Sequence, residues 1–243
     1  MKKLFLFLVG FVVLLFVGAV LVLGYLGFVP VVSSFFGSDK PRDLGIVVTQ
    51  ENFDQYLTKS ATKISPLDTE VEGKSVVFVG SEPVKTSFSQ EEVSGRLNFS
   101  KWAYMPIDQV QVKFSPDGSV EVAGRLRMDR LDGFINQVGG SQYSKADVEK
   151  GLNFLGVVMT NPIVYGKGTG SVTNNQVTAQ IDYLEVGRLP VPLEKIDANG
   201  TFTSLANHII NIVPGLDVEQ ADFMGGTLNF EGTAPSEMKV LQK

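Results

Sequence analysis

The chain opens with an apolar stretch that runs without a charged residue from Leu4 to Val29, directly after the pair Lys2-Lys3. As a helix this stretch would exceed a bilayer hydrocarbon core of about 30 Å, and the two lysines favour a cytoplasmic N-terminus. A cleaved signal peptide is the alternative, but its apolar run is usually only about 7–15 residues long. The pattern therefore predicts a signal-anchor transmembrane helix over 1–29 and a juxtamembrane linker over 30–42.

Beyond the linker, apolar and polar residues alternate on both sides of several groups of turn-forming residues. This alternation predicts half-buried antiparallel strands joined as hairpins. The turns are expected at Pro116-Asp117-Gly118, at Asn174-Asn175 and at Gly225-Gly226. In the first of them, Gly118 follows Pro-Asp and is expected to adopt a positive φ.

A short apolar strand, a Thr or Ser N-cap and a helix occur twice, over 48–57 and again over 88–97. In each helix the apolar residues recur four positions apart, which places them on one face. Ser89 and Glu92 have the spacing of a capping box. We therefore expect two strand–helix units that pack side by side.

Two further helices are expected between the hairpins. One is capped by Ser144, and the other occupies part of 193–213, with Asn199-Gly200 as a break. The elements together predict an α+β protein, in which the N-terminal transmembrane helix is followed by a twisted antiparallel sheet of hairpins with helices packed on one side. Residues 43–243 would form one extracytoplasmic domain.

The composition removes several classes of function. The chain has no cysteine, which excludes a disulfide framework, a thiolate zinc site and a cysteine nucleophile. Its formal net charge is −5 and it has no long basic run, so nucleic acid is not expected as a partner. The single histidine, His208, lies among apolar residues of an expected helix and is interpreted as a core or boundary residue. We expect neither a metal nor a cofactor.

Two short motifs resemble catalytic or phosphate-binding sequences. Ser60 and Lys63 have the S-x-x-K spacing of penicillin-recognising enzymes, but the accompanying Ser-Asp-Asn and Lys-Thr-Gly elements are missing. The glycine-rich run from Gly166 to Gly170 lacks the spacing of a phosphate loop and is better explained as a bent or bulged strand. No nucleophile–base constellation is visible, so we do not expect an enzyme.

Three segments carry a resemblance to a known family. They are Gly45–Thr49 before a short helix, Glu185–Pro192 with its Gly-Arg and proline pattern, and the hairpin from Ala221 to Pro235. In this respect the chain resembles the YpmS-like membrane-anchored envelope proteins of Gram-positive bacteria, and its hairpins are similar to those of the LmeA-like phospholipid-binding proteins. The resemblance implies a membrane-anchored envelope protein with a lipid-binding role, and it supplies no catalytic motif.

These observations lead to a hypothesis about function. We expect a membrane-anchored extracytoplasmic binding protein that holds a lipid or another amphiphile between the apolar face of the sheet and a helix, near the outer leaflet. Two interpretations are open for the basic residues of the second strand of the first hairpin: contact with lipid phosphates or an anionic envelope polymer, or an ordinary solvated strand face. The expected ligand-binding residues are Ile181, Tyr183, Ile209, Ile210, Val213, Arg125 and Arg127.

An alternative remains open at this stage. The exported domain could instead be a structural or protein-interaction module of the cell envelope, without a small ligand. Both hypotheses place the protein in the cell membrane as a single-pass protein, with its N-terminus cytoplasmic and its C-terminal domain outside, and with the bilayer as a partner of the N-terminal helix. An apolar cavity of ligand size in the structure would favour the first hypothesis.

Overall fold

The computed structural model describes the backbone of residues 2–27, 29–138 and 161–242, and the side chains of these residues except 2–11 and 30. The expected helix capped by Ser144 lies outside the described residues. The helices are α1 (Lys2–Tyr25), α2 (Pro30–Phe36), α3 (Gln50–Lys59), α4 (Gln90–Asn98), α5 (Leu131–Val138) and α7 (Ala198–Ile212), with single 3-10 turns at Met128–Arg130 and Leu193–Lys195. The strands are β1 (Lys63–Leu67), β2 (Val76–Val79), β3 (Glu82–Phe88), β4 (Ile107–Phe114), β5 (Ser119–Leu126), β6 (Ile163–Thr173), β7 (Gln176–Val186), β8 (Leu189–Pro190), β9 (Asp217–Asp222), β10 (Leu228–Ala234) and β11 (Glu237–Leu241).

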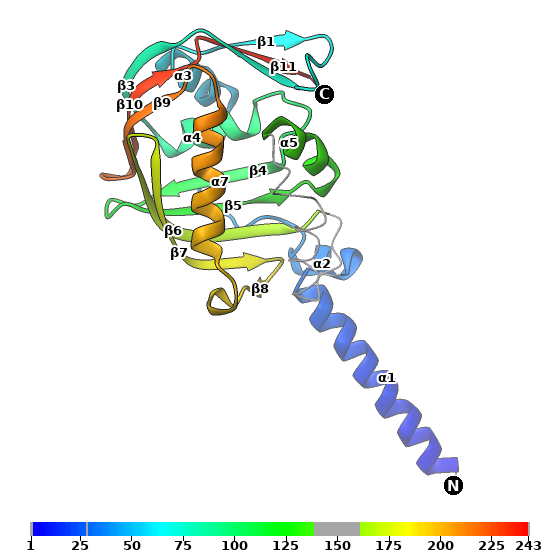
Figure 1. Cartoon of the computed structure of the whole chain (residues 1–243). Helices are drawn as coiled ribbons and strands as arrows, with labels where there is room; N and C mark the ends of the chain where they lie inside the picture. Colours follow the sequence, from blue (N-terminus) through cyan, green and yellow to red (C-terminus); the bar gives the residue numbers. More distant parts are fainter. Residues whose placement is uncertain (1, 28, 139–160, 243) are drawn as a thin grey trace.

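The described strands form two sheets (Figure 1). A curled eight-stranded sheet has the order β3-β10-β9-β6-β5-β4, with β7 on β6 and β8 on β7, and all of its pairs are antiparallel. In a three-stranded sheet, β11 lies between β1, which is parallel to it, and β2, which is antiparallel. The chain is therefore α+β, with a curled antiparallel sheet and helices packed against it.

The three predicted hairpins are confirmed as β4–β5, β6–β7 and β9–β10. Gly118 has a φ of 87°, as its turn requires, and Asn174 and Asn175 adopt φ values of 49° and 61°. Consecutive positive φ values are typical of the two-residue hairpin turn whose twist matches that of the strands. Local turn chemistry thus fixes where these strands begin and end.

The predicted capping box of Ser89 and Glu92 and the predicted Thr49 N-cap are both formed, but only one of the two strand–helix units is complete. Thr49 caps α3 and Ser89 caps α4. The helices pack so closely that a side chain on Gly95 would lie 2.8 Å from the backbone nitrogen of Phe53. Residues 45–48 before α3 do not form the expected strand, and the Gln111 side chain accepts hydrogen bonds from the backbone N–H groups of Leu44 and Ile46, at 2.7 and 3.3 Å.

Helix α7 crosses the predicted break without interruption. The Asp197 side chain accepts a hydrogen bond from the Gly200 backbone at 2.9 Å, so Asn199 and Gly200 form the first turn of the helix. Further along, α7 lies beside the free edge of β7. Asn199 and Asn207 accept hydrogen bonds from the backbone N–H groups of Ile181 and Val177, at 2.8 and 2.7 Å.

The segment that follows α2 lies against the sheet. Arg42 pairs with the buried carboxylate of Glu185 at 2.9 Å, and its guanidinium lies 3.9 Å from the centre of the Tyr165 ring. The Arg125 side chain donates to the Asp39 carbonyl. The predicted polar linker is therefore packed over strands β5, β6 and β7.

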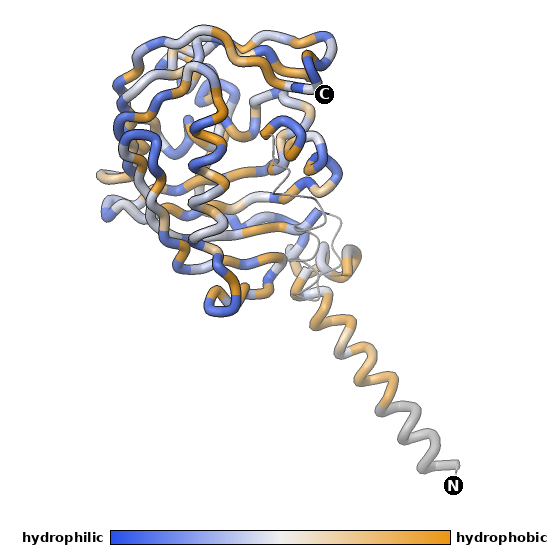
Figure 2. Tube along the Cα trace, in the orientation of Figure 1, coloured by the Kyte–Doolittle hydropathy of each residue, from blue (hydrophilic) through white to orange (hydrophobic). Residues whose placement is uncertain are grey.

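Helix α1 projects away from the two sheets, and its C-terminal end contacts α2, where the Tyr25 and Phe36 rings meet edge to face (Figure 1). Its described side chains are mostly apolar and exposed, as Leu14, Phe16 and Val22 illustrate (Figure 2). Within 2–27, 29–138 and 161–242, no helix is both long enough and apolar enough to cross a membrane.

That finding overturns the prediction of a transmembrane anchor over 1–29. The transmembrane part of the predicted fold class is corrected with it, and so is the single-pass localisation that was built on the anchor. The prediction rested on the number of consecutive uncharged residues from Leu4 to Val29. The finding rests on the length and apolar character of the described helices.

Candidate functional site

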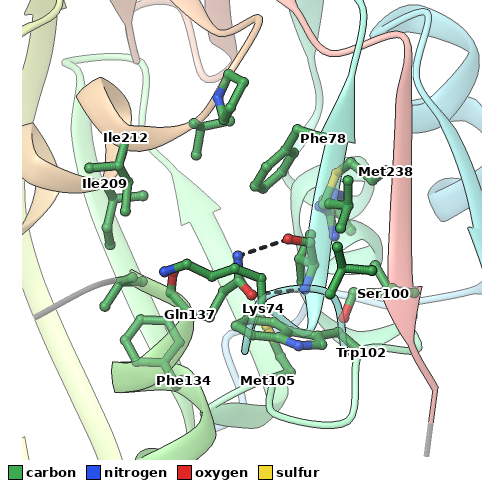
Figure 3. Close-up of a pocket in the computed structure, with 18 of the residues that line it drawn as sticks. Lys74, Phe78, Ser100, Trp102, Met105, Phe134, Gln137, Ile209, Ile212 and Met238 are labelled. Atoms are coloured by element: carbon green, nitrogen blue, oxygen red, sulfur yellow. Dashed lines mark hydrogen bonds between the residues drawn. The ribbon is translucent and has the colours of Figure 1, made fainter. Parts of the chain in front are cut away.

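A pocket of about 680 Å³ lies between α7 and the three-stranded sheet. Its described walls come from α3, α4, α5 and α7, from strands β2 and β11, and from the loops at 71–74 and 100–105. In Figure 3, Ile209 and Ile212 face Phe78 and Met238 across the pocket, with Trp102 and Phe134 below them in this view. The volume falls within the range of about 300–1,000 Å³ typical of small-molecule sites.

The lower rim of the pocket is held together by one glutamine. Gln137 of α5 accepts hydrogen bonds from the backbone N–H groups of Ser75 and Val76, both at 2.8 Å, and donates to the Val76 carbonyl at 3.0 Å. The Trp102 indole donates to the Ser75 hydroxyl at 3.0 Å. A side-chain amide thus continues the hydrogen bonding of β2 into α5 and fixes the distance between two walls.

Arg96 lines the pocket and forms no ion pair with a described carboxylate. Arg96 lies in the last turn of α4, and its one hydrogen bond within the described residues goes from Nη2 to the sulfur of Met238, at 3.2 Å. The carboxylate one turn before it, Glu92, is already taken by Lys59 at 2.8 Å and by the N-cap of α4. Burial lowers the pKa of the Arg96 guanidinium, although it stays charged at neutral pH.

The sequence-predicted residues of α7 divide between two faces of that helix. Ile209 and Val213 line the pocket, whereas Ile210 does not appear among its described lining residues. His208 also lines the pocket, and its Nε2 lies 2.8 Å from the Val138 carbonyl. The helix that was expected to face the ligand therefore does border a cavity, but the opposite wall is β2 and β11 rather than β7.

The alternation of Ile181 and Tyr183 with Gln180 and Asp182 predicts that the two residues share one face of the sheet, but in β7 they do not. Tyr183 pairs with Lys167 while Ile181 pairs with Gly168, so Asp182 is an extra residue that interrupts the alternation. Ile181 is half-buried, whereas Tyr183 is 37% exposed and donates its hydroxyl to Glu185 at 2.9 Å. Neither residue lines the pocket described above.

The two expected basic residues lie away from the pocket and have partners. Arg127 follows the end of β5 and bonds Asp108 at 2.6 Å and Asp129 at 2.7 Å. The hydrogen bonds that Arg127 donates to Asp129 and Asp108 raise the pKa of its guanidinium, and the same bonds to Asp129 lower the pKa of that carboxyl group. Arg125 is directed to the backbone of Asp39. Their binding role stays a prediction.

Sequence reasoning missed most of the pocket. The lining residues that it did not single out include Phe78, Arg96, Trp102, Phe134 and Met238. Trp102 is the only tryptophan of the chain, which could have marked it, but no spacing pattern connects it with the others. Arg96 stands beside Leu97, a predicted core residue, and nothing in the local sequence separates it from an ordinary solvated arginine.

No protein-family model, curated protein or solved structure matches this chain. The resemblance to YpmS-like and LmeA-like proteins therefore stays an expectation from the sequence. Among the described residues, no group of three or more His, Asp or Glu side chains could hold a metal ion. The pocket is therefore the structural feature that bears on function.

Proposed function

We propose that this protein is a binding module that holds an amphiphile, such as a lipid, in the pocket between α7 and the β1–β11–β2 sheet. The observation that carries the proposal is an apolar pocket of about 680 Å³ in which only a few polar groups, Arg96 among them, interrupt the hydrophobic lining. Sites for small molecules are typically lined in this way. An apolar chain would lie against the aliphatic and aromatic walls, and its polar end would meet those few groups.

Chain length should control affinity if apolar burial drives binding. Each buried methylene contributes about 0.8 kcal/mol, which corresponds to roughly a fourfold change in affinity. We expect affinity to rise with chain length and to level off once the pocket of about 680 Å³ is filled. A polar ligand of similar size would show no such dependence.

The single tryptophan offers a direct test of occupancy. Trp102 lines the pocket, so all tryptophan emission of the protein comes from its wall. A fatty acid that carries bromine atoms on its chain quenches tryptophan only on close approach. We expect titration of the full-length chain with this ligand, at one fixed concentration of a neutral detergent, to give saturable quenching.

A pair of variants on α7 separates pocket binding from adsorption elsewhere. Ile212 lines the pocket, and Ile212→Phe should fill part of it and weaken binding by about tenfold or more. Asn211→Phe adds the same side chain to the next residue, which is exposed and does not line the pocket. It should leave quenching unchanged. If the wild-type chain shows no saturable quenching, or both variants behave alike, the binding proposal is wrong and an interaction module becomes the better hypothesis.

A further inference from the structure

The positive charge of Arg96, in the lining of the apolar pocket, bears on which head group the ligand carries. An arginine on a helix normally pairs with a carboxylate one turn away. Glu92 is at that position relative to Arg96, but it is buried, accepts the Ser89 backbone N–H at 2.8 Å and pairs with Lys59 at 2.8 Å. The capping of α4 and the contact with α3 thus remove the natural partner of Arg96.

No other carboxylate replaces Glu92. Glu72 is the one carboxylate among the described lining residues, and it is exposed at the rim and forms no ion pair with Arg96. The other cation of the lining, Lys74, is occupied by the carbonyl oxygens of Asn136 and Gln137, at 3.1 and 3.0 Å. Among the described lining residues, Arg96 is therefore the arginine or lysine that has neither a carboxylate nor a carbonyl partner.

Two hydroxyl groups near Arg96 are also free. Tyr56 of α3 lines the pocket with its ring stacked on Phe88, and Ser100 lies one turn beyond Arg96 and is only 5% exposed. Neither hydroxyl has a hydrogen bond to another described residue. Burial raises the pKa of Tyr56, and the nearby charge of Arg96 partly offsets this effect. Tyr56, Ser100 and Arg96 all line the same pocket.

Together these groups form one end of an otherwise apolar pocket. Arg96 is half-buried, and a charge withdrawn from water without a partner is unfavourable, so an anionic ligand would relieve this cost. The planar guanidinium donates two parallel hydrogen bonds to a carboxylate or a phosphate, a geometry that a neutral head group does not offer. Hydroxyl groups can complete the coordination of the remaining oxygen atoms.

We propose that the ligand is an anionic amphiphile and that Arg96 binds its carboxylate or phosphate head group, with Tyr56 and Ser100 as additional donors. This inference rests on the proposed function above. The apolar chain would extend from Arg96 along Met238 and Phe78 towards Ile212 of α7.

Three ligands with the same chain and different head groups test the inference. Dodecanoate carries a carboxylate, monododecyl phosphate carries a phosphate, and dodecanol is neutral. Quenching of Trp102 by a brominated chain, displaced by each ligand in turn, gives their relative affinities for the full-length protein. We expect the anionic ligands to bind about tenfold more tightly than dodecanol, and the better of the two identifies the head group.

Variants at Arg96 then assign the preference to one side chain. Arg96→Met should remove the preference for anionic ligands and leave the affinity for dodecanol within about twofold, because the methionine keeps the apolar volume. Arg96→Lys should retain part of the preference, since it keeps a positive charge without the bidentate geometry. Arg130→Met is the control, because this variant removes one positive charge at a residue that does not line the pocket.

The outcomes separate this inference from the binding proposal. If dodecanol binds as tightly as dodecanoate, or if Arg96→Met keeps the preference while its thermal unfolding shows that it is folded, the head-group assignment is overturned and the binding module survives. If none of the three ligands displaces the brominated chain, both are overturned. Loss of the preference in Arg130→Met as well would show an effect of net charge rather than of Arg96.

Discussion

At the scale of single residues, the β4–β5 turn depends on the backbone freedom of Gly118. Its φ of 87° lies in a region that side chains with a Cβ adopt only with strain, and a Cβ there would lie 2.7 Å from the sulfur of Met224. We expect Gly118→Val to lower the free energy of unfolding by about 1–3 kcal/mol. Urea denaturation followed by circular dichroism measures this change.

A second substitution at the same position separates backbone strain from steric conflict. Asparagine tolerates a positive φ better than valine does, and the Met224 side chain can move. Gly118→Asn should therefore recover much of the stability that valine loses. Equal stability of wild type and Gly118→Val would show that the turn does not constrain the hairpin.

The same scale shows why some residues were predicted and others were not. Gly118 and the pair Asn174-Asn175 carry their conformation in their own chemistry, so the sequence predicted their turns. Tyr183 was placed on the wrong face because one extra residue, Asp182, inverts the alternation of β7 beyond it. The bulge lies opposite Gly168, and its position follows from the partner strand, which a single strand does not reveal.

At the scale of elements, α7 protects an edge strand. Asn199 and Asn207 lie about 12 Å apart along a helix at 1.5 Å per residue. Val177 and Ile181 lie about 13 Å apart along a strand at about 3.3 Å per residue. The two spacings match, so both asparagines reach outward N–H groups of β7 at once, at 2.7 and 2.8 Å. The edge is thereby closed to other strands.

Loss of a hydrogen bond between α7 and β7 should lower stability and promote self-association of the protein. In Asn207→Leu, the Val177 N–H group loses its acceptor, and we expect the free energy of unfolding to fall by about 1–3 kcal/mol. The freed edge should also promote self-association, which sedimentation velocity detects. Asn211→Leu is the matched control, because the Asn211 side chain is exposed and bonds only its own helix. Identical behaviour of the two variants would rule out a specific role for Asn207.

Element boundaries were more predictable than the way in which elements pair. Caps and turn residues act within a few positions, so the N-cap of α3, the capping box of α4 and the three hairpins could be predicted. The parallel pair β1–β11 joins residues far apart in the chain, and β6 pairs with β5 along one part of its edge and with β9 along another. These contacts depend on the closure of the whole sheet, for which short sequence windows hold no information.

At the scale of the whole molecule, the pocket exists only after four helices and the three-stranded sheet have assembled. Its described walls join Tyr56 in the first part of the domain to Val240 near the C-terminus. Sequence reasoning found the α7 wall through Ile209 and Val213, because an apolar helix stripe is a local pattern. It missed the facing wall, because the docking of β2 and β11 opposite α7 is a property of the complete fold.

Because the pocket joins four helices to the three-stranded sheet, its ligand should stabilise the molecule as a unit. A ligand that binds only the folded state adds about 2.7 kcal/mol to stability at a free concentration of 100 times its dissociation constant. We expect dodecanoate to raise the unfolding midpoint of the full-length chain, with Trp102 emission and far-ultraviolet circular dichroism shifting together. Ile212→Phe, at the same ligand concentration, should gain less, because its pocket is partly filled. A shift seen by Trp102 alone would mean that the ligand holds only the local walls, and an equal shift in Ile212→Phe would place the stabilising site outside the pocket.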